Sequence, residues 1–183
     1  MPRIWPVLLA LSFLASIAVA DGPADNSIAN VRPVPPKGIE VPEADRQALR
    51  EGLQRLSNEI EGLRGSLKDR PRLLGLLPDV QIFHRAVASA LEHGEFFNAK
   101  DLDAARTLLQ QGLDRAKELG EGKPSWEAAT GLVVRGYVSR IDGSVQPYGL
   151  VVPESYAAKS PNRFRLDVWC HGRGENLSEV NFL

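Results

Sequence analysis

Apolar residues recur between positions 42 and 67 at the spacing of a helix that packs along another helix. The gaps between them are four, three, four, three and four residues, at Leu49, Leu53, Leu56, Ile60, Leu63 and Leu67. This heptad spacing keeps one apolar stripe on one face of a helix. Pro42 suits the first helical position, and the acidic Glu43 and Asp45 suit the positive end of the helix dipole. The pattern predicts a helix from Pro42 to Leu67 with a partner helix. Each helical glycine weakens it by up to about 1 kcal/mol relative to alanine, at Gly52, Gly62 and Gly65.

Two further apolar stripes predict two further helices. The first begins near Pro78 and ends at Gly94, and its apolar face carries Val80, Phe83, Val87 and Leu91. The second begins after Asn98, which suits the N-cap position because Asp101 follows three residues later. Its apolar face carries Leu102, Ala105, Leu109, Leu113 and Ala116. The short connection between these two helices favours an antiparallel pair, with the first helix packed beside it.

After Trp126 the hydrophobic period changes from that of helices to that of strands. Leu132 to Ile141 reads as one strand, and Val145 to Val152 reads as the strand that returns beside it. The intervening Asp142-Gly143 predicts a type I′ hairpin turn, which needs positive φ at both central residues. Pro147 interrupts the second strand and favours an edge or a bulge there.

A third strand is predicted from Phe164 to Cys170. Polar and apolar residues alternate along it, so that one face carries Phe164, Leu166, Val168 and Cys170. Trp169 breaks the polar face, as happens when a strand is covered on both sides. We expect this to be the most buried strand, with Cys170 as a buried free thiol.

The predicted third strand runs directly into the glycine-bracketed turn His171-Gly172-Arg173-Gly174. Two glycines let the backbone bend sharply, and free N–H groups at such a turn can stabilise an oxyanion. The alternative is an ordinary turn between a strand and a helix that needs glycine for its geometry. Asn176 or Ser178 could then cap a helix that carries Val180, Phe182 and Leu183, with Glu175 or Glu179 in its first turn.

Leu166 to Glu175 resembles the segment of α/β-hydrolases in which an early central strand ends in a His-Gly oxyanion loop. The stretch from Gly143 to Tyr156 looks like the opening strands of the same fold. The resemblance is to secreted bacterial serine hydrolases of the prolyl oligopeptidase type, and it covers roughly Gly131 to Leu183.

This resemblance implies a fold of the α/β class: an N-terminal antiparallel helical segment followed by the first strands of an α/β-hydrolase sheet, truncated. It also implies a peptide or ester substrate and an oxyanion loop made of His171, Gly172, Arg173, Gly174 and Glu175. The backbone N–H of Gly172 or of Arg173 would be one oxyanion donor, and His171 would orient the loop.

The sequence departs from that family in one respect that decides the expected activity. Such hydrolases carry a Gly-x-Ser-x-Gly nucleophile elbow, then an acid, then a histidine, all after the oxyanion loop. No such pentapeptide occurs here, eight residues follow Glu175, and His84 and His93 come too early for that order. We therefore expect the N-terminal part of an exported peptidase or esterase, with no catalytic residue and no activity of its own.

The composition argues against several other classes of function. Lysine plus arginine number 22 and aspartate plus glutamate number 23, so no strong basic field favours nucleic acid. A single cysteine, Cys170, excludes an internal disulfide and a thiolate metal cluster. His84 has no Cys, Asp or Glu at metal-ligand spacing, which favours a structural role. The sequence predicts no cofactor and no metal.

The N-terminus has the order of an export signal. Arg3 precedes an apolar run from Val7 to Val19, and Ala18-Val-Ala20 is a small-x-small cleavage pattern. The apolar run is too short for a stable membrane span, which needs about 20 residues. We predict a signal peptide over 1–20 and a secreted or periplasmic protein. The predicted organisation continues with a proline-rich linker over 21–41, a helical segment over 42–122 and the start of an incomplete hydrolase domain over 126–183.

Two other interpretations remain open. The chain could be an exported, non-enzymatic helical binding protein, in which the heptad stripe serves interaction or self-association. It could also be a truncated product without an independent function. The coding sequence beyond Leu183 distinguishes these alternatives from the hydrolase.

Overall fold

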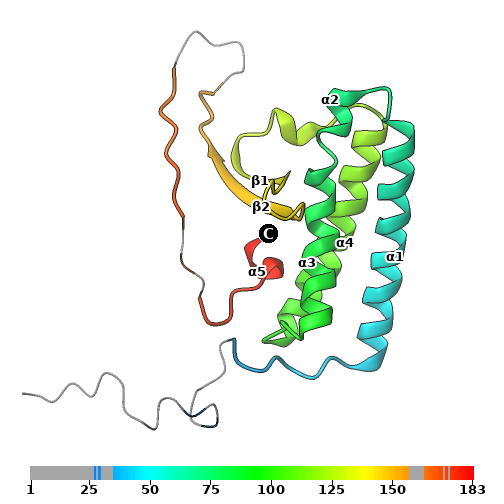
Figure 1. Cartoon of the computed structure of the whole chain (residues 1–183), viewed down its shortest axis with the longest axis vertical. Helices are drawn as coiled ribbons and strands as arrows, with labels where there is room; N and C mark the ends of the chain where they lie inside the picture. The colour runs from blue at the N-terminus through cyan, green and yellow to red at the C-terminus, as the bar shows by residue number, and fades with distance from the viewer. Residues whose placement is uncertain (1–26, 28, 30–34, 157–162, 171, 173) are drawn as a thin grey trace, which may run out of the picture. The chain divides into compact units, whose positions relative to one another are not determined.

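The computed structural model describes residues 27, 29, 35–156, 163–170, 172 and 174–183. The chain divides into two units, residues 1–33 and residues 34–183, and the elements below belong to the second (Figure 1). They are α1 (Glu43–Ser66), α2 (Pro71–Leu74), α3 (Pro78–His93), α4 (Ala99–Gly120), the 3₁₀ turn η2 (Ser125–Glu127), β1 (Gly131–Val138), β2 (Val145–Val152) and α5 (Glu179–Phe182). The predicted signal peptide and most of the predicted linker lie outside the described residues.

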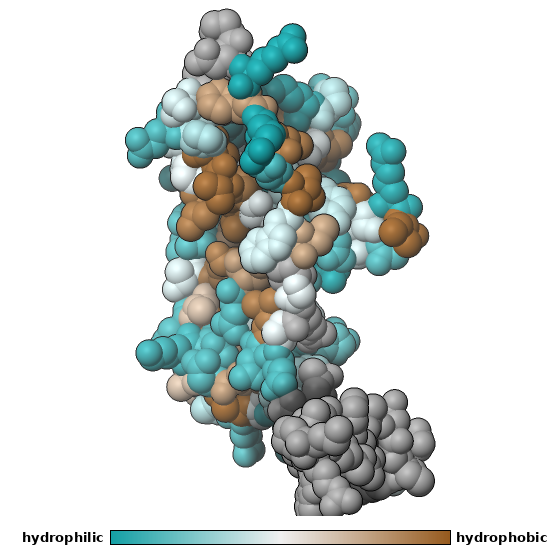
Figure 2. All heavy atoms as spheres, turned by 90° about the vertical axis from the view of Figure 1, so that its left-hand side faces the viewer, coloured by the Kyte–Doolittle hydropathy of each residue, from teal (hydrophilic) through white to brown (hydrophobic). Residues whose placement is uncertain are grey.

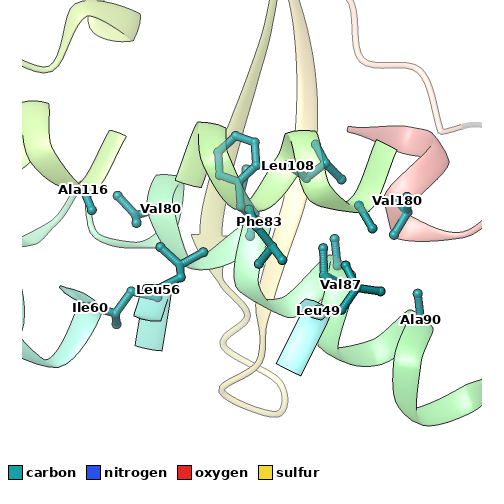
Figure 3. Close-up of a cluster of buried hydrophobic side chains, with 14 of the residues drawn as sticks. Leu49, Leu56, Ile60, Val80, Phe83, Val87, Ala90, Leu108, Ala116 and Val180 are labelled. Carbon is teal, nitrogen blue, oxygen red and sulfur yellow. The ribbon is translucent and has the colours of Figure 1, made fainter. Parts of the chain in front are cut away.

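The three long helices, α1, α3 and α4, lie side by side (Figure 1) and enclose the hydrophobic core. The heptad stripe of α1 points into this core, where Leu49, Leu56 and Leu67 are fully buried. Figure 3 shows Leu49, Leu56 and Ile60 of α1 gathered with Phe83 and Val87 of α3. Both α3 and α4 contact α1, so the partner that the heptad spacing predicts lies within this chain.

Gly112 lets the three helices approach one another closely. A Cβ at this position of α4 would lie 2.6 Å from Cδ2 of Leu56 on α1 and 3.0 Å from Cβ of Phe83 on α3. By contrast, a Cβ at Gly62 on α1 would meet nothing within 4 Å. One helical glycine is therefore required by packing, whereas the other only weakens its helix.

The helix ends follow the sequence prediction. Gly94 ends α3 in the left-handed region with φ 66°. At the start of α4, the side chain of Asn98 accepts a hydrogen bond from the backbone N–H of Lys100 at 2.9 Å. The Asp101 carboxylate in turn accepts from the backbone N–H of Asn98 at 3.1 Å. This is the predicted capping box, and it satisfies N–H groups that have no partner inside the helix.

β1 and β2 pair as an antiparallel hairpin whose register runs from Gly131 opposite Val152 to Val138 opposite Val145. The predicted type I′ turn is wrong. The backbone N–H of Ser139 donates to the Ser144 carbonyl at 2.8 Å, so residues 140–143 form the connecting loop. Gly143 has φ 70°, and no described non-glycine residue has a positive φ, so Asp142 cannot adopt the first position of that turn.

The predicted third strand is also wrong. Residues 163–170 run as an extended trace in Figure 1 but form no strand, and Leu166 and Val168 are 80% and 81% exposed. Cys170 is a free thiol, but it is exposed rather than buried. A strand depends on hydrogen bonds to a neighbouring strand. The described sheet contains only β1 and β2, and residues 163–170 pair with neither.

Candidate functional site

The described residues of the predicted oxyanion loop lie on the surface. Gly172, Gly174 and Glu175 are exposed, whereas His171 and Arg173 lie outside the described residues. A Cβ at Gly172 would meet nothing within 4 Å. Close packing therefore does not require glycine at residue 172.

The segment after this loop is anchored to the helices. Ser178 caps α5, because its Oγ accepts a hydrogen bond from the backbone N–H of Asn181 at 3.3 Å. Val180 is 3% exposed and joins the core. The Nε of Arg85 on α3 donates to both carboxylate oxygens of Glu179, at 3.0 and 3.2 Å. Of the two cap candidates that the sequence offers, Asn176 and Ser178, the structure uses Ser178.

A cavity of about 370 Å³ lies between this anchored segment, α3 and β2. Its polar lining includes Ser89, Gln146, Ser178 and the two carboxylates of Glu95 and Glu179. Among the described residues, no hydrogen bond joins a serine hydroxyl to a histidine, and no cluster of three metal-ligating side chains occurs.

A buried carboxylate joins the hairpin to the helices. Asp79, in the first turn of α3, is 1% exposed and accepts three hydrogen bonds. The donors are Nε1 of Trp126 at 2.9 Å, Nε of Arg135 at 2.9 Å and the backbone N–H of Gly136 at 2.7 Å. A Cβ at Gly136 would lie 2.2 Å from the Pro78 carbonyl oxygen, so only glycine permits this approach of β1 to α3.

Arg115 of α4 completes this polar cluster. Its guanidinium donates to the carbonyl oxygens of Asp79 and Val134, each at 3.0 Å. The guanidinium carbon also lies 4.9 Å from the ring centre of Phe83 and 5.0 Å from that of Trp126. Burial lowers the pKa of Arg115, and the Asp79 carboxylate opposes that shift. The cluster fixes the hairpin on the helices and leaves no polar side-chain atom buried without a partner in the described residues.

This cluster was not predicted from the sequence, in which Asp79 simply follows the Pro78 that begins the helix. The available signal was Arg115, which follows Gly112 by three residues and therefore lies on the core side of α4. A cation at such a position needs a buried partner. In the structure the partners of Arg115 include the Asp79 carbonyl oxygen, and the Asp79 carboxylate lies close enough to raise its pKa.

Of the helices in the described ranges, none combines the length and the apolar composition that a membrane crossing requires. The chain matches no family model, and neither curated proteins nor solved structures provide a match. The oxyanion role of residues 171–175 and the export signal stay predictions.

Proposed function

We propose that this chain is the N-terminal part of an exported serine hydrolase that acts on peptides or esters. The observation that carries the proposal is an apolar surface on the hairpin. Leu132 and Val151 lie opposite each other in the register and are 88% and 79% exposed. Figure 2 shows hydrophobic side chains at the surface on this side of the molecule.

Residues 163–170 carry a second set of exposed apolar side chains, which supports the same proposal. Their extended backbone and exposed apolar side chains fit a strand that lacks its neighbours. Exposed apolar surface marks sites of contact with other proteins, membranes or ligands. Further strands of an α/β sheet would cover both surfaces, with helices on the outside.

In the proposed enzyme, a serine supplied from beyond Leu183 attacks the carbonyl carbon while a histidine takes the hydroxyl proton. The carbonyl oxygen becomes an oxyanion and accepts a hydrogen bond from the backbone N–H of Gly172 or of Arg173. Loss of one such donor raises the barrier by about 3 kcal/mol. Collapse of the intermediate expels the amine or alcohol, which receives the proton from the histidine. Water then releases the acyl group.

The test is to sequence the coding DNA beyond the Leu183 codon and to express both the extended protein and the 183-residue chain. The extended protein is expected to encode Gly-x-Ser-x-Gly, to hydrolyse a p-nitrophenyl ester and to react with a fluorophosphonate probe. The 183-residue chain is expected to do neither. Labelling of a serine within this chain together with turnover would contradict the proposal, and so would a continuation without the elbow.

A further inference from the structure

Residues 177–183 occupy a site formed by α3, α4 and β2, which we call the α5 site. Both α3 and α4 contact α5. Val180 of α5 is 3% exposed and lies in the same cluster of buried side chains as Val87 of α3 (Figure 3). A Cβ at Gly149 of β2 would lie 3.8 Å from Cζ of Phe182, so the Phe182 ring lies against the strand at that glycine. The site therefore recognises an apolar and an aromatic side chain two residues apart.

A charged contact gives the α5 site a second element of recognition. The Nε of Arg85 donates to both carboxylate oxygens of Glu179, and the two side chains are 35% and 24% exposed. Hydrogen bonds between charged groups are stronger than neutral ones, and partial burial reduces their screening by water. Arg85 therefore selects an acidic residue immediately before the apolar Val180.

The chain reaches the α5 site through residues 153–176, which form neither helix nor strand where the structure describes them. Leu177 lines a cavity together with Pro147, so the chain returns to a point five residues before Val152, the end of β2. At about 3.3 Å per residue, this return covers about 16 Å along the strand. A chain of about 24 residues spans up to about 80 Å. Its length therefore does not decide which copy's site the segment enters.

Few contacts hold the segment in its site. Val180 is the one buried apolar side chain among the described residues of 153–183. A cavity of about 370 Å³ remains beside Leu177 and Phe182, so the segment does not fill the space around it. Elements with few buried contacts open locally at a lower free energy than the core. We therefore expect residues 177–183 to leave the α5 site while α1, α3 and α4 stay folded.

We propose that the α5 site accepts residues 177–183 of a second copy of this chain, so that two chains exchange these segments and form a dimer. The second copy is the occupant because its segment has the sequence that the site already holds. Exchange keeps every contact of the site, so monomer and dimer differ only in the connection and in the entropy of association. A tethered segment has an effective concentration in the millimolar range. The unmodified chain is therefore a monomer at micromolar concentration. The proposal does not depend on the proposed hydrolase activity.

The test mixes two full-length variants, Arg85→Glu and Glu179→Arg. Each variant alone brings two like charges together in its own α5 site. Reciprocal exchange in the mixture pairs opposite charges in both sites. If each restored contact changes the equilibrium about tenfold, the dissociation constant falls about a hundredfold, from the millimolar range to about 10 µM. The matched control carries both substitutions in one chain, which restores the pair within its own site and is expected to stay monomeric.

Light scattering after size exclusion, at about 50 µM chain, gives the oligomeric state. Native mass spectrometry with one variant labelled by ¹⁵N identifies the heterodimer. We expect a one-to-one heterodimer in the mixture and monomers of each variant alone. A monomeric mixture would overturn the proposal. Dimers of either variant alone would also overturn it, because they would show association through another surface, such as the exposed Leu132 and Val151.

Circular dichroism of each variant establishes that the helices are folded. If either charge variant loses helicity, deletion of residues 156–176 decides the question. Residues 153–155 then join Val152 to Leu177 and span at most about 14 Å, too short to turn and return about 16 Å along β2. This variant is expected to be a dimer that Val180→Asp dissociates. A folded monomer of the deletion variant would overturn the proposal.

Discussion

Replacement of Asp79 should detach the hairpin from the helices. Asp79→Ala removes one carboxylate that accepts hydrogen bonds from Trp126, Arg135 and Gly136. Removing one partner of a buried ion pair costs about 3–5 kcal/mol, because the other charge stays buried. The Arg135 side chain is 19% exposed, so water can reach it and the lower end applies. We expect a loss of about 3 kcal/mol in the free energy of unfolding.

Asp79→Asn should cost less than Asp79→Ala. The asparagine amide keeps the shape of the side chain and one acceptor oxygen. Its NH₂ group replaces the other oxygen, so at least one N–H group that donated to the carboxylate loses its acceptor. We expect a loss of about 2 kcal/mol, from one unsatisfied buried donor. Hydrogen exchange should show early loss of protection in β1, while α1 keeps its protection, because the cluster holds the strand and not the first helix.

The assay is urea unfolding followed by circular dichroism, with Asp103→Ala as the matched control. Asp103 makes the same kind of contact, an ion pair with Arg106, but its side chain is 79% exposed. Its removal should change the free energy of unfolding by less than about 1 kcal/mol. Equal losses in the free energy of unfolding for Asp79→Ala and Asp103→Ala would refute the argument that burial makes the Asp79 contacts more stabilising than an exposed ion pair.

Three further predictions concern packing, pH and reactivity. Gly62→Ala should raise the free energy of unfolding by up to about 1 kcal/mol in thermal or urea melts, because its Cβ enters open space; Gly112→Ala should lower it, because overpacking costs about 1–3 kcal/mol. A lowered pKa of His84 from its ordinary 6.5 means that the unfolded chain binds a proton first as pH falls, so stability should decline below about pH 6.5. His84→Gln should flatten that decline in urea melts between pH 7 and pH 5, and an unchanged slope would contradict the assignment. Cys170 is exposed and should react with a thiol reagent in the folded chain as fast as in urea; slow labelling that urea accelerates would contradict the exposed placement.

The helical half of the molecule could be predicted from the sequence because its signals are local. The heptad of α1, the αL glycine at Gly94 and the capping box at Asn98 each depend on residues within one or two turns. A helix satisfies most of its backbone hydrogen bonds internally, so periodicity together with the residues at its ends indicates where it forms. The prediction was weaker where a contact joins distant elements, as at Asp79 with Trp126 and Arg135.

The formation of β-strands depends on neighbouring strands that a local sequence pattern does not identify. Polar and apolar residues alternate along residues 163–170, yet these residues have no neighbouring strand, whereas β2 pairs with β1. The apolar side chains of residues 163–170 are accordingly exposed, and Cys170 with them. Binary patterning specifies which face of a strand is apolar, but a strand forms only where another strand accepts its hydrogen bonds. The prediction of an oxyanion loop depends on a family resemblance, and no local sequence pattern makes that prediction independently.

The anchored C-terminal segment has a consequence for protein engineering. The chain leaves the hairpin at Val152 and returns to the core through Glu179 and Val180, while the described residues between them form neither helix nor strand. Lengthening a closed loop adds only about 0.6 kcal/mol of entropy per doubling. A reporter domain could therefore be inserted between residues 153 and 176 without unfolding the helices, provided that its own termini lie close together. A change in the signal of the inserted domain would then show whether the Arg85–Glu179 ion pair is formed.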